Sequence, residues 1–245
     1  MAITQTPGIT YNEIDTDPNA NGIGAEIPIF IGISGNSTPY NGVQKFKKYE
    51  DACVVPTATT PGLGTSVTNN PLLATVKDFF EETKKVNSDD IGIPYIYVID
   101  LGNIALRSGT EATTATEATI TAWTNAMKLA KTVQEVTMEV YVGFNSTDTS
   151  ADYLSLMVSA DTKIKEYVSM CQPRIGYFTV EGATDTALKA LTSASVNQHS
   201  RICLIEPTNF GQIFARIAIT PYFEEPGYYT FRSVGEGEFA ERSKE

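Results

Sequence analysis

The sequence predicts an α/β fold: a mostly parallel β-sheet flanked by helices, in a three-layer arrangement of the doubly wound type. Between residues 25 and 206, short apolar segments alternate with longer segments whose apolar residues recur at helical spacing. Such alternation requires crossover connections, and therefore parallel strands with helices on the faces of the sheet. With 42% hydrophobic residues among 245, the chain can bury a core without disulfides or metals.

The chain begins with a segment that we expect to be extended. Pro7 and Gly8 disfavour a helix, and β-favouring residues follow up to Tyr11. The polar residues 15–24, which include Pro and Gly, indicate a loop. This pattern predicts an N-terminal arm followed by a linker.

The first core strand is expected at 25–34. Its residues are apolar on both faces, which is typical of a central strand, and Pro28 marks its beginning. Residues 35–70 are rich in Thr, Pro and Gly and predict a surface excursion. The segment VQKFKKYEDACVV within this excursion predicts one small helix or strand.

The first long helix is expected to begin at Pro71, with Asn70 as its N-cap. An apolar stripe with helical spacing should face the core; it consists of Leu72, Val76, Phe79, Phe80 and Thr83. The polar residues 87–90 end this helix. A buried strand then follows at 93–101.

The remaining elements continue the alternation. Helices are predicted at 120–134, 153–171 and 185–196, and strands at 138–144, 175–180 and 201–205. After residue 206 a short helical piece, NFGQIFARIAI, leads into a segment rich in aromatic residues, Pro and Gly. We therefore predict three parts: the arm and linker at 1–24, an α/β core domain at 25–206, and the start of a second α+β unit at 207–245.

Charge and cysteine content exclude several classes of function. The net charge is −11, and no Lys or Arg precedes Lys45, which argues against nucleic acid or an anionic membrane as the main partner. Cys53, Cys171 and Cys203 are widely spaced, form no CxxC pair, and lie in apolar contexts, so we expect buried free thiols. No secretory signal opens the sequence, and no apolar run is long enough to cross a bilayer.

The residues give little indication of catalysis or of a cofactor. His199, the single histidine, is expected in a solvated connector, so no Ser-His-Asp or Cys-His site is indicated. Asp100 and Glu206 end predicted parallel strands, where α/β sites gather, but we favour the simpler interpretation, in which each carboxylate caps a loop or helix. We therefore predict a protein that is not an enzyme, with no cofactor.

A metal or phosphate site near residues 17–24 is also not favoured. Asp17 to Gly22 match the first half of a calcium loop, but Pro28 stands where a bidentate Glu is required, so a turn is the simpler interpretation. The Gly22–Ile23–Gly24 run lacks the third glycine of a dinucleotide fingerprint and precedes a strand. We predict no metal site.

Four segments resemble contractile phage tail sheath proteins, in the order that this family has them. They are TPGITYNEID, EIPIFIGISG, the stretch from NPLLATVKDFF to IPYIYVID, and FARIAITPYFEEPGYYTFRSV. The last, with a Thr-Pro-aromatic step before a Glu-Pro-Gly turn, is the most specific. Sheath subunits usually continue further, through a C-terminal domain that grips the inner tube, so the resemblance suggests that the chain is truncated.

This resemblance implies a structural subunit of a virion tail or related contractile injection system, assembled in the host cytoplasm. Copies would polymerise helically around a tail tube protein, between baseplate and terminator proteins, with no nucleic-acid contact and no membrane insertion. Residues assigned to assembly lie in the arm and at the domain junction. They are Pro7, Gly8, Ile9, Tyr11, Glu13 and Ile14, and Pro221, Tyr222, Phe223, Glu225, Pro226 and Gly227.

The residues themselves leave alternatives open. Fourteen extended residues span roughly 45 Å, enough for the arm to add a strand to a neighbouring subunit. Equally, residues 8–14 can pair back on residues 26–33, and the junction aromatics can pack on their own domain. Two rival functions also remain: an α/β enzyme of hydrolase or transferase type, with a deep polar pocket near Asp100 and Glu206, or a monomeric binding module.

Overall fold

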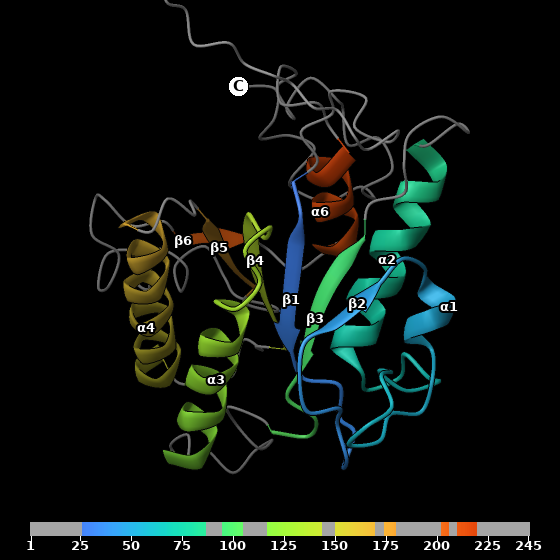
Figure 1. Ribbon diagram of the computed structural model, residues 1–245, viewed down its shortest axis with the longest axis horizontal. Helices are drawn as coiled ribbons and strands as arrows, with labels where there is room; N and C mark the ends of the chain where they lie inside the picture. Colours follow the sequence, from blue (N-terminus) through green and yellow to red (C-terminus); the bar gives the residue numbers. More distant parts are fainter. Residues whose placement is uncertain are drawn as a thin grey trace, which may run out of the picture.

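A six-stranded, mostly parallel sheet forms the centre of the protein (Figure 1). The computed structural model describes residues 26–86, 95–104, 117–143, 150–169, 174–179, 202–205 and 210–219. The strands lie in the order β2-β3-β1-β4-β5-β6, and only β2 is antiparallel to its neighbour. Their bounds are Pro28–Gly32 for β1, Gln44–Phe46 for β2, Ile96–Asp100 for β3, Met138–Val142 for β4, Ile175–Thr179 for β5 and Ile202–Ile205 for β6.

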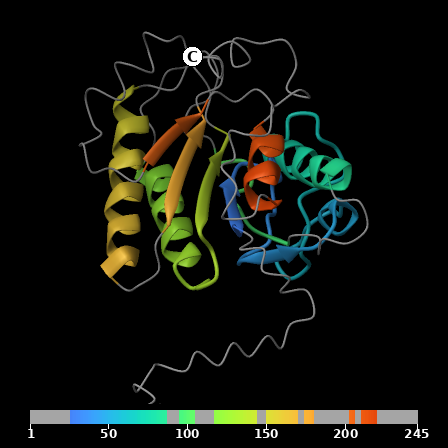
Figure 2. The ribbon, with the colours of Figure 1, turned by 90° about the horizontal axis from the view of Figure 1, so that it is seen from above.

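Helices cover both faces of this sheet (Figure 2). On one face, α3 (Glu117–Ala130) and α4 (Ser150–Ser169) pack against alternate strand residues such as Ile29 and Ile31. On the other face, α1 (Tyr49–Ala52), α2 (Pro71–Val86) and α6 (Phe210–Ile219) pack around Phe30. Because successive side chains of a strand point to opposite faces, one apolar strand supplies both cores. The predicted α/β class, with a mostly parallel sheet and flanking helices, is confirmed.

The first long helix begins as the sequence predicts. Asn70 Oδ1 accepts a hydrogen bond from the backbone N–H of Leu73 at 2.9 Å, so Asn70 caps α2, and Pro71 is its first residue. The predicted apolar stripe is buried throughout, including Phe79 and Phe80. In α4, apolar residues at helical spacing are buried as well: Met157, Ala160, Ile164 and Tyr167.

Several predictions needed correction. The segment expected to hold one small helix or strand contains both, β2 and α1, because Phe46 and Ala52 each reach the same core. Helix α3 ends at Ala130 rather than at residue 134. Arg174 donates to the carbonyl group of Ala130, in the last turn of α3, and to that of Val133 in the segment that follows. The helix predicted at 185–196 lies outside the described residues.

The prediction of three buried thiols is wrong for two cysteines. Cys203 is exposed because β6 lies at the end of the described sheet, and Cys53, at the end of α1, is only partly buried. Both are free thiols. Cys171 lies outside the described residues.

Helix α6 belongs to the stretch predicted to begin a second unit. It packs side by side with α2, and Phe214 contacts Phe30 of the central strand at a ring-centroid distance of 6.2 Å. Residues 210–219 therefore share a core with the α/β domain. None of the helices in the described ranges combines the length and the apolarity needed to cross a lipid bilayer.

Candidate functional site

The residues predicted to mediate assembly lie outside the described part of the chain. This applies to the arm residues Pro7, Gly8, Ile9, Tyr11, Glu13 and Ile14, and to the junction residues Pro221, Tyr222, Phe223, Glu225, Pro226 and Gly227. It applies also to His199, to Glu206 and to the loop 17–24. Asp100 is the sequence-predicted candidate whose surroundings are described.

Asp100 lies at the carboxyl end of β3 and holds the ends of two adjacent parallel strands together. Ser34, just past the end of β1, donates its hydroxyl to Asp100 Oδ2 at 2.8 Å. The backbone N–H of Gly102 donates to Asp100 Oδ1 at 2.7 Å, and Asn36 Nδ2 lies 3.4 Å from Oδ2. Asp100 is buried, with 6% of its surface exposed. Three donors therefore converge on one buried carboxylate.

Two opposing effects act on the pKa of Asp100. Burial raises the pKa, because removing water disfavours the charged form, whereas the hydrogen bonds from Ser34, Gly102 and Asn36 lower it. Burial is the larger effect, so the pKa of this carboxyl lies above its usual value. The cluster thus contains a carboxyl that holds its proton more tightly than a solvated aspartate.

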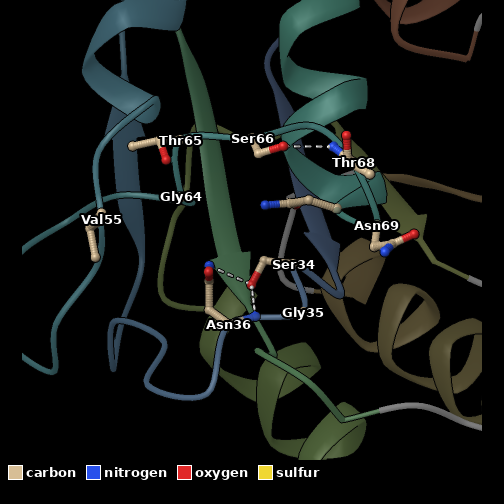
Figure 3. A pocket seen from close by; sticks show the side chains of 10 residues that line it. Ser34, Gly35, Asn36, Val55, Gly64, Thr65, Ser66, Thr68 and Asn69 are labelled. Carbon is tan, nitrogen blue, oxygen red and sulfur yellow. Dashed lines mark hydrogen bonds between the residues drawn. The ribbon is translucent and has the colours of Figure 1, made fainter.

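An open pocket of about 320 Å³ is lined in part by Ser34 and Asn36, the two side chains that donate to Asp100 (Figure 3). Its lining comes from the end of β1 and from the loop that leads into α2, and consists mainly of small polar residues and glycine: Ser34, Gly35, Asn36, Val55, Gly64, Thr65, Ser66, Thr68, Asn69 and Asn70. Ser34 and Asn36 face each other at its wall, where Asn36 donates to Ser34 Oγ through both its side chain and its backbone. The volume is at the lower end of the range for small-ligand sites.

Most polar groups of the pocket wall form hydrogen bonds within the protein. Asn36 and Asn70 both donate to the carbonyl oxygen of Leu63, at 2.9 and 2.7 Å, and fix the loop against the start of α2. Gly35 N–H donates to the Gly102 carbonyl at 2.8 Å. Gly102 adopts φ +68°, and a side chain there would lie 2.7 Å from the Asn36 carbonyl oxygen. The wall is therefore a hydrogen-bonded clasp that joins three loops.

This arrangement offers limited chemistry. Ser34 already donates its proton to Asp100, whose oxygens are occupied by donors, so a nucleophile–base pair would have to break the clasp first. In the described ranges no group of three or more His, Cys, Asp or Glu side chains is arranged to hold a metal ion. The clasp suits positioning of loops at the strand ends.

A second polar cluster is fully buried under α3. Arg174, at the start of β5, donates to Glu139 Oε1 at 2.8 Å, to the Ala130 carbonyl at 3.0 Å and to the Val133 carbonyl. Tyr141 donates its hydroxyl to Glu139 at 2.6 Å. Burial raises the pKa of Glu139, against the effect of Tyr141 and Arg174. This network joins two strands to the end of a helix.

Sequence reasoning identified Asp100 but missed its partners and the buried ion pair. Ser34 and Asn36 could have been found, because they directly follow a predicted parallel strand, at the edge where Asp100 was expected. Glu139 in the apolar run MEVYV was a further signal, since a buried carboxylate requires a partner. Its partner Arg174 is distant in sequence, and only the parallel pairing of β4 with β5 brings the two together.

The position of β1 bears on the arm. It pairs along one side with β3 and along the other with β4, both in parallel. Residues 28–32 therefore have no free edge for another strand, which excludes the alternative in which residues 8–14 pair back on this strand. If the arm forms a strand, its partner must lie elsewhere.

Comparison with models of known protein families and with curated proteins gave no match to this chain.

Proposed function

We propose that this chain is a structural subunit of a contractile tail sheath. In this proposal copies of the chain polymerise helically around an inner tube protein, with baseplate and terminator proteins at the ends of the polymer. Contraction then drives injection by moving subunits against one another, without nucleotide hydrolysis. The protein acts as a building unit of a virion tail or related injection particle, not as an enzyme.

The observation that carries the proposal is the pairing of β1 on both sides. The segment TPGITYNEID resembles the opening of sheath proteins, and its β-favouring residues need a strand partner to form a sheet. Because β3 and β4 occupy both edges of β1, the nearest strand in sequence is not available. A neighbouring copy is a partner that a helical polymer would supply repeatedly.

The finer description of the fold belongs to this proposal. The parallel strands in sheet order are β3-β1-β4-β5-β6, in which the chain moves outward from β1 in both directions. This is the order of doubly wound folds with a switch point beside the first strand. We assign the chain to that type, with an N-terminal arm at 1–24 and a second α+β unit that begins after α6, because α6 shares the core of the α/β domain.

Deletion of residues 1–14 tests the proposal. We expect the parent chain to form tubes or striated rods at high concentration, and the deletion variant to remain a monomer with an unchanged melting curve, because the arm contributes pairing between copies and not to the core. Negative-stain electron microscopy and circular dichroism measure the two properties. A deletion variant that still assembles, or one that unfolds, contradicts the role of the arm.

A milder variant pair controls for the deletion. Ile9→Pro with Tyr11→Pro removes two backbone donors from the strand-forming part of the arm, and should also abolish assembly. Thr4→Pro introduces the same residue earlier in the arm and should leave assembly intact. Equal behaviour of the two variants would show that the arm does not act as a strand.

A second candidate is a module that binds a small polar molecule, and one observation favours it. The pocket lined in part by Ser34 and Asn36 lies at the carboxyl ends of parallel strands, where α/β proteins bind ligands. An NMR titration with small neutral polyols and amides would test it. Saturable shifts confined to residues 34–36 and 64–70, in a chain that stays monomeric, would favour this candidate over the sheath subunit.

A further inference from the structure

We propose that Tyr95, Tyr97 and Glu135 form a binding site for a quaternary or methylated ammonium group, and that Lys45 of the same chain occupies this site as an internal ligand. An external ammonium group binds when the Lys45 side chain withdraws. This inference goes beyond the proposed function and does not rest on it. Three observations support it: two perpendicular tyrosine rings beside a cation, a carboxylate held by both ring hydroxyls, and an occupant that forms no hydrogen bond in the site.

Two tyrosine rings lie beside the ammonium group of Lys45. Its Nζ is 3.5 Å from the centre of the Tyr95 ring and 5.2 Å from the centre of the Tyr97 ring. The two ring planes are nearly perpendicular, at 86°, and their centres are 5.8 Å apart. Both cation distances lie within the roughly 6 Å over which an aromatic ring attracts a cation. The rings therefore form two walls of a cation site.

Glu135 supplies the negative charge of the site. The hydroxyl of Tyr95 donates to Glu135 Oε2, and the hydroxyl of Tyr97 donates to Oε1. These two hydrogen bonds are the main reason why the pKa of Glu135 lies below its usual value. Burial, together with the hydrogen bond to Glu135, raises the pKa of Tyr97 to about 12. At neutral pH the carboxylate is therefore charged and the Tyr97 hydroxyl keeps its proton.

The secondary structure holds these side chains in place. Lys45 of β2 lies directly opposite Tyr97 of β3, so the two side chains share one face of the sheet, and Tyr95 directly precedes β3. Glu135 lies between α3 and β4, in a segment whose Val133 carbonyl accepts from a buried arginine. A site that is already ordered loses less conformational freedom when it binds a ligand.

The Lys45 ammonium matches the site in charge but not in hydrogen bonding. Glu135 Oε1 lies 3.7 Å from Nζ, beyond hydrogen-bond distance, and no other described residue accepts a hydrogen bond from Nζ. Both oxygens of Glu135 already accept from tyrosine hydroxyls. A primary ammonium must therefore keep its N–H groups on water. A quaternary ammonium has no N–H group to satisfy, so it fits this site better.

Lys45 can leave the site at little cost. Its side chain is 40% exposed and that of Glu135 is 44% exposed, so water reaches the pair. Exposed ion pairs contribute little to stability, because water screens the charges and ordering a long side chain costs entropy. As a tethered ligand, however, Lys45 competes at a high effective concentration with any ligand in solution. The parent chain should therefore bind ammonium ligands weakly, and removal of the lysine should open the site.

A titration with choline tests the site. Binding to the full chain, at a concentration where it is monomeric, is followed by NMR through the ring signals of Tyr95 and Tyr97. We expect Lys45→Ala to bind choline about tenfold or more tighter than the parent chain, because the internal competitor is gone. The neutral analogue 3,3-dimethylbutan-1-ol, in which carbon replaces the quaternary nitrogen, should bind Lys45→Ala about tenfold more weakly than choline. Equal binding of the two ligands, or no gain over the parent chain, would overturn the inference.

Matched variants locate the binding. Lys47→Ala removes another exposed lysine of the same segment and should bind choline as the parent chain does. In the Lys45→Ala chain, Tyr95→Leu should abolish the gain in affinity, whereas Tyr40→Leu, a half-buried tyrosine outside this cluster, should preserve it. Circular dichroism shows whether each variant folds. Glu135→Gln changes an exposed residue conservatively and should lower the affinity about fivefold, so the test stands even where Tyr95→Leu does not fold.

The outcomes of these variants are clear. A gain in affinity that Lys47→Ala reproduces, or that survives both Tyr95→Leu and Glu135→Gln, would overturn the assignment of the site. A gain that requires Tyr95 and Glu135 and that Lys45 suppresses would support it.

Two ligands distinguish the sources of the ammonium group. Choline represents a small molecule, and a short peptide with one trimethyllysine represents a side chain of another protein. Binding of either ligand to the Lys45→Ala chain supports the site, and the tighter of the two indicates the source. The same peptide with unmodified lysine should bind more weakly than the trimethylated one, because its N–H groups find no acceptor in the site. Tighter binding of the unmodified peptide would overturn the assignment to a quaternary or methylated ammonium.

Discussion

The buried pair of Arg174 and Glu139 shows how a single residue can join three elements. The Arg174 guanidinium binds Glu139 of β4 and the carbonyl groups of Ala130 and Val133, and it lies over the ring of Tyr167, 4.5 Å from its centre. Both charged side chains are fully buried. The pair removes two charges from water, and each charge is tolerated only because the other is present.

Removing the Arg174 guanidinium alone should therefore destabilise the folded protein strongly. We expect Arg174→Met to lower the free energy of unfolding by about 3–5 kcal/mol, because Glu139 stays buried without its partner. Adding Glu139→Gln should recover part of this loss, since the neutral amide can still accept from Tyr141. Urea denaturation measures both, with exposed Lys128→Met as a control that should change stability by less than about 0.5 kcal/mol. A double variant less stable than Arg174→Met would contradict the explanation.

Asp100 gives a residue-scale prediction that depends on pH. Because its pKa is raised in the folded protein, the folded state binds the Asp100 proton more tightly than the unfolded chain does. Its contribution to stability is then full below the ordinary value of 3.8 and is lost as pH rises through the raised pKa. Asp100→Asn should remove this dependence, at a cost of about 1–2 kcal/mol because one acceptor is lost.

Urea titrations of both proteins from about pH 3.5, just below the ordinary value of 3.8, to about pH 7 measure the difference. The stability of the parent relative to Asp100→Asn should fall as pH rises. A parent protein that gains stability relative to Asp100→Asn over this range would show that the hydrogen bonds outweigh burial.

At the scale of elements, α2 and α6 pack closely against each other. A side chain at Gly211 would lie 2.2 Å from the Thr75 carbonyl oxygen and 2.9 Å from the Phe79 backbone nitrogen. Arg216 of α6 also binds Glu82 of α2 through its Nε at 2.8 Å. Burial raises the pKa of Glu82, but Arg216 and Lys85 outweigh burial and the pKa is lowered.

Gly211→Ala tests this close approach. Alanine favours a helix by about 1 kcal/mol over glycine, so helix propensity alone predicts a gain in stability. We expect a loss of about 1–3 kcal/mol instead, because the obstructing atoms are backbone and the two helices must separate. Thermal unfolding followed by circular dichroism shows whether Gly211→Ala raises or lowers the stability. Val158→Ala, at a half-exposed position of α4, should leave the melting temperature nearly unchanged.

These elements also show how far the sequence allowed prediction. Helix α2 could be predicted because its cap, its first proline and its apolar stripe are local signals, and β1 because apolar residues on both faces indicate a central strand. The antiparallel β2 could not be predicted, since a strand of three residues is held by pairing with β3, whose partner residues lie 50 to 54 positions further along the chain. Of the Asp100 clasp, the sequence allowed prediction of the carboxylate, because Asp100 ends a strand. It did not allow prediction of the donors, which lie in loops.

At the scale of the whole molecule, the domain is tightly packed at its centre and open at its edges. β1 is paired on both sides and covered on both faces, and its residues from Ile29 to Ile31 are fully buried. Among the described residues, β2 pairs with β3 alone, and Lys45 is exposed. The sheath subunit that we propose would need a centre of this kind to move as a rigid body during contraction, with its changeable contacts at the periphery.

Native-state hydrogen exchange should reveal this gradient. The amides of β1 should exchange only through global unfolding, because every neighbouring strand must separate before they reach water. The outward-facing amides of β2 should exchange fastest among the strands of the monomer, and should slow by about tenfold or more on assembly if an arm strand covers them. Mass spectrometry of the monomer and of the polymer measures both. Protection that increases at β6 and not at β2 would place the covered edge at the other end of the sheet, and β1 amides that exchange as fast as those of β2 would refute a rigid centre.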